Sequence, residues 1–413
     1  MSSKVYITFC VILLSIAVIL SNILKLTTIT KESKRSLGYH EDTLLNFTEL
    51  SARYGYSSEE HTVVTEDGYV LTMFRINGRK CTKLKRPPVI LMHGLLQSSD
   101  AWLDAGPDAG LAYLISDACY DLWVGNQRGN YYSRRHLRLD PDRDPEFWEF
   151  SKDQIGLYDV PATIDYVLKN TNEKKMNYIG YSQGGGTYLI MCSERPGYCE
   201  KANVFIGLAP ATIGIRMSMA LQVVLHMARL FEELLTAINI YEVSPKGSLM
   251  EEFLVFFCRY RLPAKFICGN ILALLDSSHP GSIKEETIRK LYAHFPVGTS
   301  VRTIAHYGQI LLADHFQKYD YGKRGNLKIY QAVKPPIYNF SAVTVPFVTL
   351  YGRNDKMVSK ESILWLIEKL PNVLEAFEVS DPLWNHFDVA YSQFTKKMIF
   401  PKIIEYLERF SIS

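Results

Sequence analysis

Short apolar runs that end at a glycine or a polar turn recur along the chain and predict the strands of a sheet. Several of these runs are apolar at consecutive positions, which is typical of parallel strands that are buried on both faces. They cover residues 87–94, 120–126, 176–182, 203–211 and 345–352, with a further strand-like run at 373–379. Residues 59–76 instead alternate apolar and polar positions around Asp67-Gly68, a dipeptide that favours a hairpin turn, and therefore predict an antiparallel pair at the start of the sheet.

Helical patterns lie between these runs. Residues 155–168 place apolar side chains at helical spacing, residues 187–193 suit a helix, and residues 391–410 are expected to form a terminal helix. Because strands and helices alternate, the chain is predicted to form an α/β fold with a doubly wound, mostly parallel sheet.

One connection interrupts this alternation, since more than a hundred residues with little strand character separate the runs at 203–211 and 345–352. We expect residues 212–336 to form an inserted helical cap with a lid, on a core made of residues 25–211 and 337–413. The apolar positions of residues 213–275 cover more than one helical face, which leaves two interpretations open. They pack within the cap, or they form a mobile lid that meets lipid and buries its apolar face when closed.

The charged residues do not form a binding stripe for nucleic acid. In 413 residues there are 46 Lys and Arg and 43 Asp and Glu, a net charge of +3, and the basic residues are scattered. A neutral or weakly charged ligand suits this balance better. No metal or cofactor motif is present, and neither a partner chain nor an oligomeric state follows from the sequence.

The N-terminus departs from the average composition of the chain. After Lys4, an apolar run covers Val5 to Leu20 and continues to Leu24. Residues 1–24 are predicted to be a secretory signal peptide, with an uncleaved membrane anchor as the alternative. Either assignment sends the rest of the chain into the secretory pathway, to be secreted, lysosomal or anchored to a membrane.

That pathway permits glycans and disulfides. Asn46 and Asn339 stand in Asn-x-Ser/Thr sequons and are candidate glycosylation sites. Cys258 and Cys268 flank a polar loop in the predicted cap and are the best disulfide candidates. Cys119 and Cys192 lie in apolar segments, where free buried thiols are expected.

Gly180-Tyr181-Ser182-Gln183-Gly184 fits G-x-S-x-G, the pattern of a sharp strand-to-helix turn that exposes a serine hydroxyl. A predicted buried strand precedes the serine and a helix-compatible stretch follows it, as in the nucleophile elbow of the α/β-hydrolase fold. Ser182 is therefore the candidate nucleophile.

A serine needs a base to accept its proton and an acid to orient that base, and in this fold they follow the serine in the order acid, histidine. Asp355 comes directly after the predicted strand at 345–352 and is the candidate acid. His386 is the only histidine after His315 and is the candidate general base. Asp381 and Asp388 are weaker candidates for the acid, because they are too close to His386 in sequence.

Two backbone N–H groups stabilise the oxyanion in this fold. One belongs to the residue after the nucleophile, here Gln183, and the other to the loop after the third strand, which makes Leu95 the candidate. His93, two residues earlier, is expected to be structural, because one base serves both acylation and deacylation.

Seven segments of the chain closely resemble the acid lipases, the group of gastric and lysosomal acid lipases and their insect relatives. The resemblance runs from about Glu59 to the C-terminus and lies in HGLLQSSDAW, GNQRGNYYSRRH, EFWEFSKDQIGLYDVPATIDYVL, GYSQGG, GTSVRTIAHYGQ, YGRNDKMV and WNHFDVAY. It implies an α/β-hydrolase that hydrolyses neutral lipid esters, such as triacylglycerols or cholesteryl esters, under a cap and lid and without a cofactor.

By position, the resemblance places Ser182, Asp355 and His386 on the family triad. It also places Leu95 and Gln183 on the oxyanion pair, and Cys258 with Cys268 near the cap disulfide of the family. The chain departs from the family at Tyr181, where a histidine is usual, and at Gln154, where an acidic residue is usual. Tyr181 adjoins the nucleophile, so it can alter the acyl pocket or the pH profile.

The leading hypothesis is a lipase that acts at lipid–water interfaces through an acyl-enzyme intermediate on Ser182. Two alternatives remain. One is a carboxylesterase that prefers shorter or soluble esters, and the other is a non-catalytic lipid-binding protein that keeps the pocket without turnover.

Overall fold

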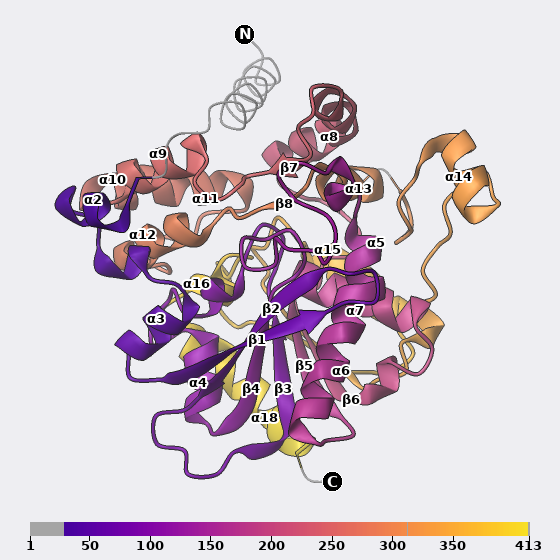
Figure 1. Cartoon of the computed structure of the whole chain (residues 1–413). Coiled ribbons are helices and arrows are strands. Elements are labelled where there is room, and N and C mark those ends of the chain that lie inside the picture. Colours follow the sequence, from indigo (N-terminus) through magenta and orange to yellow (C-terminus); the bar gives the residue numbers. More distant parts are fainter. Residues whose placement is uncertain (1–28, 312, 412–413) are drawn as a thin grey trace.

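An eight-stranded sheet forms the centre of the computed structural model, which describes residues 29–311 and 313–411 (Figure 1). The strands lie in the order β1-β2-β4-β3-β5-β6-β9-β10, and every pair from β4 to β10 is parallel, whereas β1–β2 and β2–β4 are antiparallel. The predicted doubly wound, mostly parallel sheet is confirmed. The strands are β1 (Ser57–Val64), β2 (Val70–Asn77), β3 (Lys85–Met92), β4 (Tyr120–Gly125), β5 (Met176–Tyr181), β6 (Ala202–Leu208), β9 (Phe347–Tyr351) and β10 (Val373–Glu378).

The predicted hairpin at the start of the sheet is confirmed, although its turn is longer than two residues. Strands β1 and β2 pair from Ser57–Asn77 to Val64–Val70, so residues 65–69 form the connection. Gly68 takes a positive φ of 96° there, a conformation that glycine adopts without a steric penalty.

Helices cover both faces of the sheet, which explains why its central strands are apolar at consecutive positions. On β3, Val89 and Leu91 belong to the core that includes α4 (Leu111–Asp117) and α18 (Phe400–Arg409). Ile90 and Met92 belong to the core on the other face, with α6 (Val160–Thr171) and α7 (Gln183–Glu194). Successive side chains of a strand point to opposite faces, so each face receives its own apolar set.

The terminal helix predicted over residues 391–410 is confirmed only in its second half. The chain forms α16 (Asp388–Tyr391), α17 (Thr395–Met398) and then α18. Pro401 lies in the first turn of α18, where its missing N–H costs no hydrogen bond but where it cannot continue a helix from the preceding residues. The helix predicted at 155–168 instead begins with a π-helical turn, η4 (Ile155–Asp159), before α6.

Residues 212–336, here called the insert, are mostly helical and contribute no strand to the eight-stranded sheet. Figure 1 shows helices α8 to α13 gathered at one end of the sheet. The insert contains α8 (Met219–Ala237), β7 (Glu242–Val243), α9 (Leu249–Cys258), α10 (Arg261–Pro263), η6 (Ala264–Cys268), α11 (Gly269–Leu275), α12 (Glu285–His294), β8 (Thr299–Ser300), α13 (Val301–Leu311) and α14 (Gly322–Tyr330). Its helical character agrees with the predicted cap, and the boundaries of that cap stay a prediction.

The remaining short elements connect these parts. They are α2 (Lys31–Ser36), η1 (Glu41–Leu44), α3 (Phe47–Arg53), η2 (Ser99–Trp102), η3 (Pro145–Trp148), α5 (Lys152–Gln154), η5 (Cys199–Lys201), η7 (Phe340–Ala342) and α15 (Lys360–Lys369). In the described ranges, no helix is both long enough and apolar enough to cross a membrane. The predicted signal peptide or anchor at residues 1–24 lies outside these ranges.

Three disulfides are formed, and two of them contradict the expectation of free thiols. The candidate pair Cys258–Cys268 is bonded, as are Cys81–Cys119 and Cys192–Cys199. The apolar surroundings of Cys119 and Cys192 pointed to buried free thiols, but folding places a second cysteine beside each. For Cys192, η5 returns the chain to the end of α7 within seven residues.

Candidate functional site

Three loops that follow parallel strands bring Ser182, Asp355 and His386 together. Ser182 lies between β5 and α7, Asp355 follows β9, and His386 lies between β10 and α16. Because the carboxyl ends of parallel strands meet at one edge of the sheet, these loops are neighbours although their residues are far apart in sequence.

The three side chains form a continuous chain of hydrogen bonds. His386 Nε2 lies 2.9 Å from Ser182 Oγ, and His386 Nδ1 lies 2.7 Å from Asp355 Oδ2. The second carboxylate oxygen of Asp355 accepts the backbone N–H groups of Met357 (2.9 Å) and Val358 (2.7 Å). With Nδ1 donating to the carboxylate, Nε2 is left as the acceptor for the serine hydroxyl.

Ser182 lies in a strained backbone conformation, with φ 51° and ψ −114°. A Cβ atom at position 180 would lie 2.7 Å from the carbonyl oxygen of Gly184, and one at position 184 would lie 2.6 Å from that of Met92. Only glycine fits at these two positions, which is the physical reason for the pattern G-x-S-x-G.

Burial and charge act in opposite directions on His386. Ser182, Asp355 and His386 are 7%, 1% and 2% exposed. Burial lowers the pKa of His386, but the carboxylate of Asp355, which both attracts and hydrogen-bonds the ring, and the nearby Asp276 together hold this pKa above its usual value. The site therefore stabilises an imidazolium ion.

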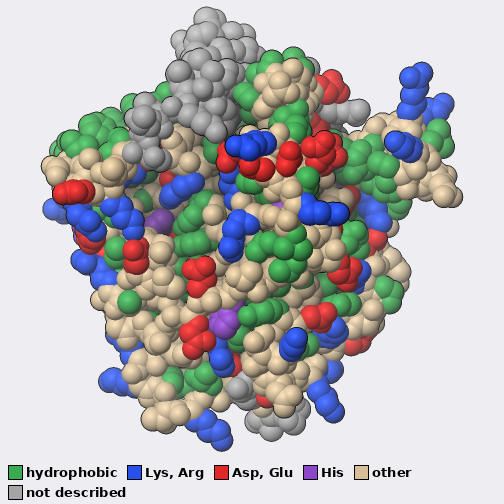
Figure 2. All heavy atoms as spheres, in the orientation of Figure 1, with side chains coloured by type: hydrophobic (Ala, Val, Ile, Leu, Met, Phe, Trp, Pro, Cys, Tyr) green, Lys and Arg blue, Asp and Glu red, His purple; other side chains and the backbone are tan. Residues whose placement is uncertain are grey.

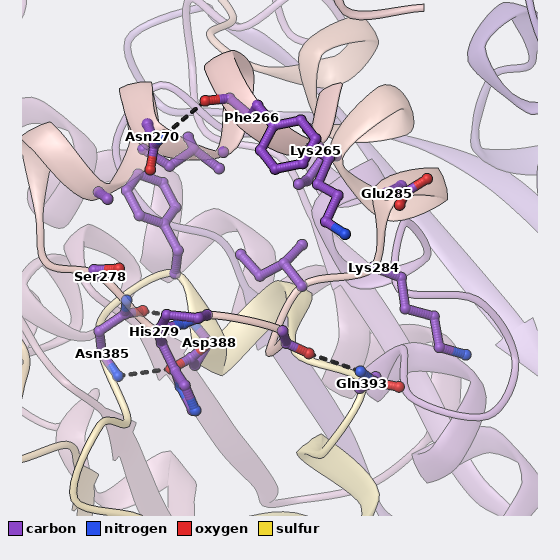
Figure 3. Close-up of a pocket in the computed structure, with 18 of the residues that line it drawn as sticks. Lys265, Phe266, Asn270, Ser278, His279, Lys284, Glu285, Asn385, Asp388 and Gln393 are labelled. Carbon is purple, nitrogen blue, oxygen red and sulfur yellow. Dashed lines mark hydrogen bonds and ion pairs between the residues drawn. The ribbon is translucent and has the colours of Figure 1, made fainter. Parts of the chain in front are cut away.

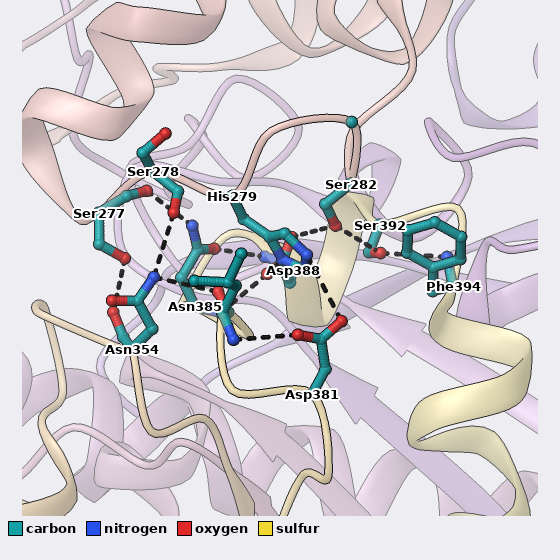
Figure 4. A network of polar contacts seen from close by, with 12 residues as sticks. Ser277, Ser278, His279, Ser282, Asn354, Asp381, Asn385, Asp388, Ser392 and Phe394 are labelled. Atoms are coloured by element: carbon teal, nitrogen blue, oxygen red, sulfur yellow. Dashed lines mark hydrogen bonds and ion pairs between the residues drawn. The ribbon is translucent and has the colours of Figure 1, made fainter.

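The two alternative acids bind a different histidine. The carboxylate of Asp388 accepts hydrogen bonds from the backbone N–H of Asn385 (2.8 Å) and lies 2.6 Å from His279 Nδ1. Asp381 lies 3.5 Å from His279 Nε2 (Figure 4). Asp355 is thus the carboxylate that contacts the ring of His386.

His93 has contacts that fit a structural role. Burial lowers its pKa to about 4, so its ring is neutral at physiological pH. Nδ1 lies 2.8 Å from the carbonyl oxygen of Gly94, and Nε2 accepts the backbone N–H of Gln127 at 3.1 Å. The ring therefore joins the loops after β3 and β4.

The two residues predicted to bind an oxyanion lie at ordered backbone positions. Gln183 is the first residue of α7, where an N–H group has no partner within the helix. Leu95 lies in a braced loop, in which Gly94 N donates to Gln97 Oε1 at 2.9 Å and Leu96 O accepts the N–H of Val297 from the insert at 2.9 Å.

Tyr181, which stands where the acid lipases usually have a histidine and precedes the candidate nucleophile, contacts the candidate base directly. Its hydroxyl donates to the carbonyl oxygen of His386 at 2.9 Å, and the two ring centroids are 4.9 Å apart. Gln154, the other departure, completes a capping box: its Oε1 accepts the backbone N–H of Ser151 at 2.8 Å, an acceptor role that needs no charge.

Asp276 is a residue of the site that the sequence did not single out. It follows α11 in the insert, is buried, and accepts the backbone N–H of His386. No motif surrounds it, and its role depends on how the insert folds back on the core. Near it, a cavity of about 770 Å³ separates η6 and α12 from the loop of Asn385 and Phe387, as Figure 3 shows.

Both candidate glycosylation sites are exposed. Asn46 Oδ1 caps α3 by accepting the N–H of Glu49, and Asn339 Oδ1 accepts the N–H of Ser341. These capping bonds use the oxygen of each amide, whereas a glycan is joined to its nitrogen.

Comparisons with known proteins agree with the fold. The family described as "alpha/beta hydrolase fold" matches residues 87–392, and the "Partial alpha/beta-hydrolase lipase region" matches residues 47–106. Lipase 1 of Drosophila melanogaster is 36% identical over 89% of this chain and 80% of its own length. Gastric triacylglycerol lipase of Homo sapiens is 33% identical over 88% of this chain and 91% of its own length.

Among solved structures, a hypothetical protein of Pseudomonas aeruginosa covers 86% of this chain and 94% of its own, with a TM-score of 0.52 and 11% identity, a likeness of fold alone. The sheet, the elbow and the family match define an α/β-hydrolase. Within that class, the chain belongs to the acid-lipase family, with the gastric lipases and the insect lipases, and is a carboxylic ester hydrolase.

Tyr181→Phe tests how far the hydroxyl of Tyr181 holds His386 in place. The variant removes one of the two hydrogen bonds to the buried carbonyl of His386 and leaves the other, from the backbone N–H of Val389 at 3.3 Å. We therefore expect a loss of about 0.5–1.5 kcal/mol in stability and a fall of about tenfold in ester hydrolysis, because a loosened base is misplaced. Thermal unfolding and the turnover of p-nitrophenyl esters measure the two effects.

Tyr188→Phe is the matched control, because the buried hydroxyl of Tyr188 also donates to a backbone carbonyl, that of Cys199, away from the site. It should lose stability but keep its activity. Equal losses of activity in both variants would mean that the hydroxyl of Tyr181 acts only through stability.

Proposed function

We propose that this protein is a lipase that hydrolyses neutral lipid esters, such as triacylglycerols or cholesteryl esters, with Ser182 as nucleophile, His386 as general base and Asp355 as the acid that orients the base. The hydrogen-bond chain from Ser182 Oγ through His386 to Asp355 is the observation that carries the proposal. It is the arrangement that serine hydrolases use to activate a hydroxyl.

In the proposed mechanism, Ser182 Oγ attacks the ester carbonyl while its proton passes to His386 Nε2. The backbone N–H groups of Gln183 and Leu95 bind the resulting oxyanion. His386 then gives the proton to the departing alcohol, which leaves an acyl-enzyme. Water, deprotonated by the same nitrogen, releases the fatty acid and restores Ser182.

The surface of the insert supports a substrate that is presented at a lipid–water interface. Figure 2 shows apolar side chains gathered over the region of α9 to α11. The exposed ones are Phe253, Phe256, Tyr260, Leu262, Phe266, Ile267, Ile271 and Leu274. A patch of this kind is a liability in water and an advantage on lipid, so we assign the insert as a cap with a lid. The names of the relatives, lipases and gastric triacylglycerol lipases, support the same substrate class.

We also infer that the enzyme works outside the cytosol. The apolar N-terminal segment, the three disulfides and the exposed sequons at Asn46 and Asn339 together support passage through the secretory pathway, with secretion as the favoured destination.

Removing the nucleophile should abolish lipolysis. Ser182→Ala is expected to lower the release of oleate from emulsified trioleoylglycerol by up to about 10⁶-fold, because no other group can form the acyl-enzyme. Titration of released fatty acid measures the rate. Ser380→Ala, a change at an exposed serine, is the control and should retain full activity. Equal rates for wild type and Ser182→Ala would exclude the proposed mechanism.

A chain-length series separates the lipase from the carboxylesterase, the second candidate that the same hydrogen-bond chain supports. Triacylglycerols from triacetin to triolein are assayed below and above their solubility limits. A lipase gains activity when the substrate forms an interface. A rate that saturates with dissolved triacetin or tributyrin and does not rise on emulsification would favour the carboxylesterase.

A further inference from the structure

One segment of the insert, residues 275–279, is held between the loops that carry Asp355 and His386 (Figure 4). Ser277 Oγ donates to the carbonyl oxygen of Asn354 at 2.5 Å, and Asn385 Nδ2 donates to the carbonyl oxygen of Ser277 at 2.8 Å. The segment thus bridges the residue before Asp355 and the residue before His386.

The carboxylate of Asp276 makes the central contacts of this bridge. One oxygen accepts the backbone N–H of Lys356 at 2.7 Å, and the other accepts the backbone N–H of His386 at 2.7 Å. Asp276 is 4% exposed, so water does not replace these bonds. A single buried side chain therefore sets the distance between the loop of the acid and the loop of the base.

Asp276 also adds charge beside His386 without touching its ring nitrogens, which contact Asp355 and Ser182. The charged and titratable groups around His386 come from four places. They are Asp355 after β9, Asp276 from the insert, Tyr181 at the end of β5, and Asp388 with its partner His279 beside the loop of His386 itself. Only the first two raise the pKa of His386 through their charge.

We propose that Asp276 is a positioning residue for ester hydrolysis: its buried carboxylate fixes the loops of Asp355 and His386 relative to each other. This inference rests on the proposed roles of Ser182 and His386. It makes the insert part of the catalytic apparatus as well as a cover, because the carboxylate comes from the insert.

The acid–base behaviour of the cluster gives this role a signature. Burial and the neighbouring Asp355 raise the pKa of Asp276 to about 8, against the effect of His386 and the two N–H donors. Two such groups share protons and titrate together. Asp276 is one of the two carboxylates whose charge raises the pKa of His386. Its removal should therefore let His386 lose its proton at a lower pH.

Asp276→Asn tests the proposal. The amide is nearly isosteric but places an NH₂ group against one of the two N–H donors and carries no charge. We expect kcat for a p-nitrophenyl ester to fall by about 10- to 100-fold, with KM changed less than kcat, and the acid limb of kcat/KM to shift to lower pH. Asp276→Glu keeps the negative charge but lengthens the side chain by one methylene group. It should also lower kcat but leave the acid limb of kcat/KM near that of the wild type.

Ser277→Ala is the matched control, since it removes a neighbouring bond to the loop of Asp355 without a change in charge. It should leave the acid limb in place. A wild-type kcat and pH profile in folded Asp276→Asn would overturn the proposal. A fall in kcat with no shift of the acid limb of kcat/KM in that variant would also overturn it, because this result indicates a structural role alone. If the wild type itself hydrolyses no ester through Ser182, the proposed function fails instead, and the two failures are therefore distinguishable.

Discussion

The hydrogen bond between Ser182 and His386 is the contact on which the rest of the site depends. It joins residues that are 204 positions apart, and it forms only if the elbow after β5 and the loop after β10 are both held at one edge of the sheet. Glycines at 180 and 184 allow the elbow, because a Cβ at either position would collide with backbone. Asp355 fixes the ring from the other side. The parallel sheet therefore acts as the rigid support of the chemistry.

The insert contributes to this support. It supplies Asp276 to the loops of Asp355 and His386, and Val297 to the loop that carries Leu95. Its outer surface, at α9 to α11, is apolar and exposed. The same segment thus presents an apolar surface to the surroundings and hydrogen-bonded polar groups to the site. A movement of the insert would accordingly alter the geometry of the loops beneath it.

Much of this arrangement could be predicted from the sequence, because it depends on local rules. Consecutive apolar residues identified the parallel strands, and the elbow glycines identified Ser182. Asp355 and His386 follow Ser182 in the order acid, histidine, after later predicted strands, and were therefore identified as its partners. The structure brings the three side chains into contact. The missed features have different causes. Asp276 has no motif, and the partner of Cys119 lies 38 positions away, so both depend on long-range folding. Cys192 pairs with Cys199 only 7 positions further on, and Pro401 divides a pattern that looked like one helix, so the signals for these two lie in the local sequence.

Covalent labelling with an organophosphate such as diethyl p-nitrophenyl phosphate tests the central claim, that Ser182 is an activated nucleophile, without reference to any lipid. Peptide mass spectrometry of the folded protein should find the phosphoryl adduct on Ser182 alone, and heat-unfolded protein or His386→Ala should not be labelled there, since the hydroxyl then has no base. A folded wild-type protein that remains unlabelled at Ser182, or that is labelled equally after unfolding, would contradict the account.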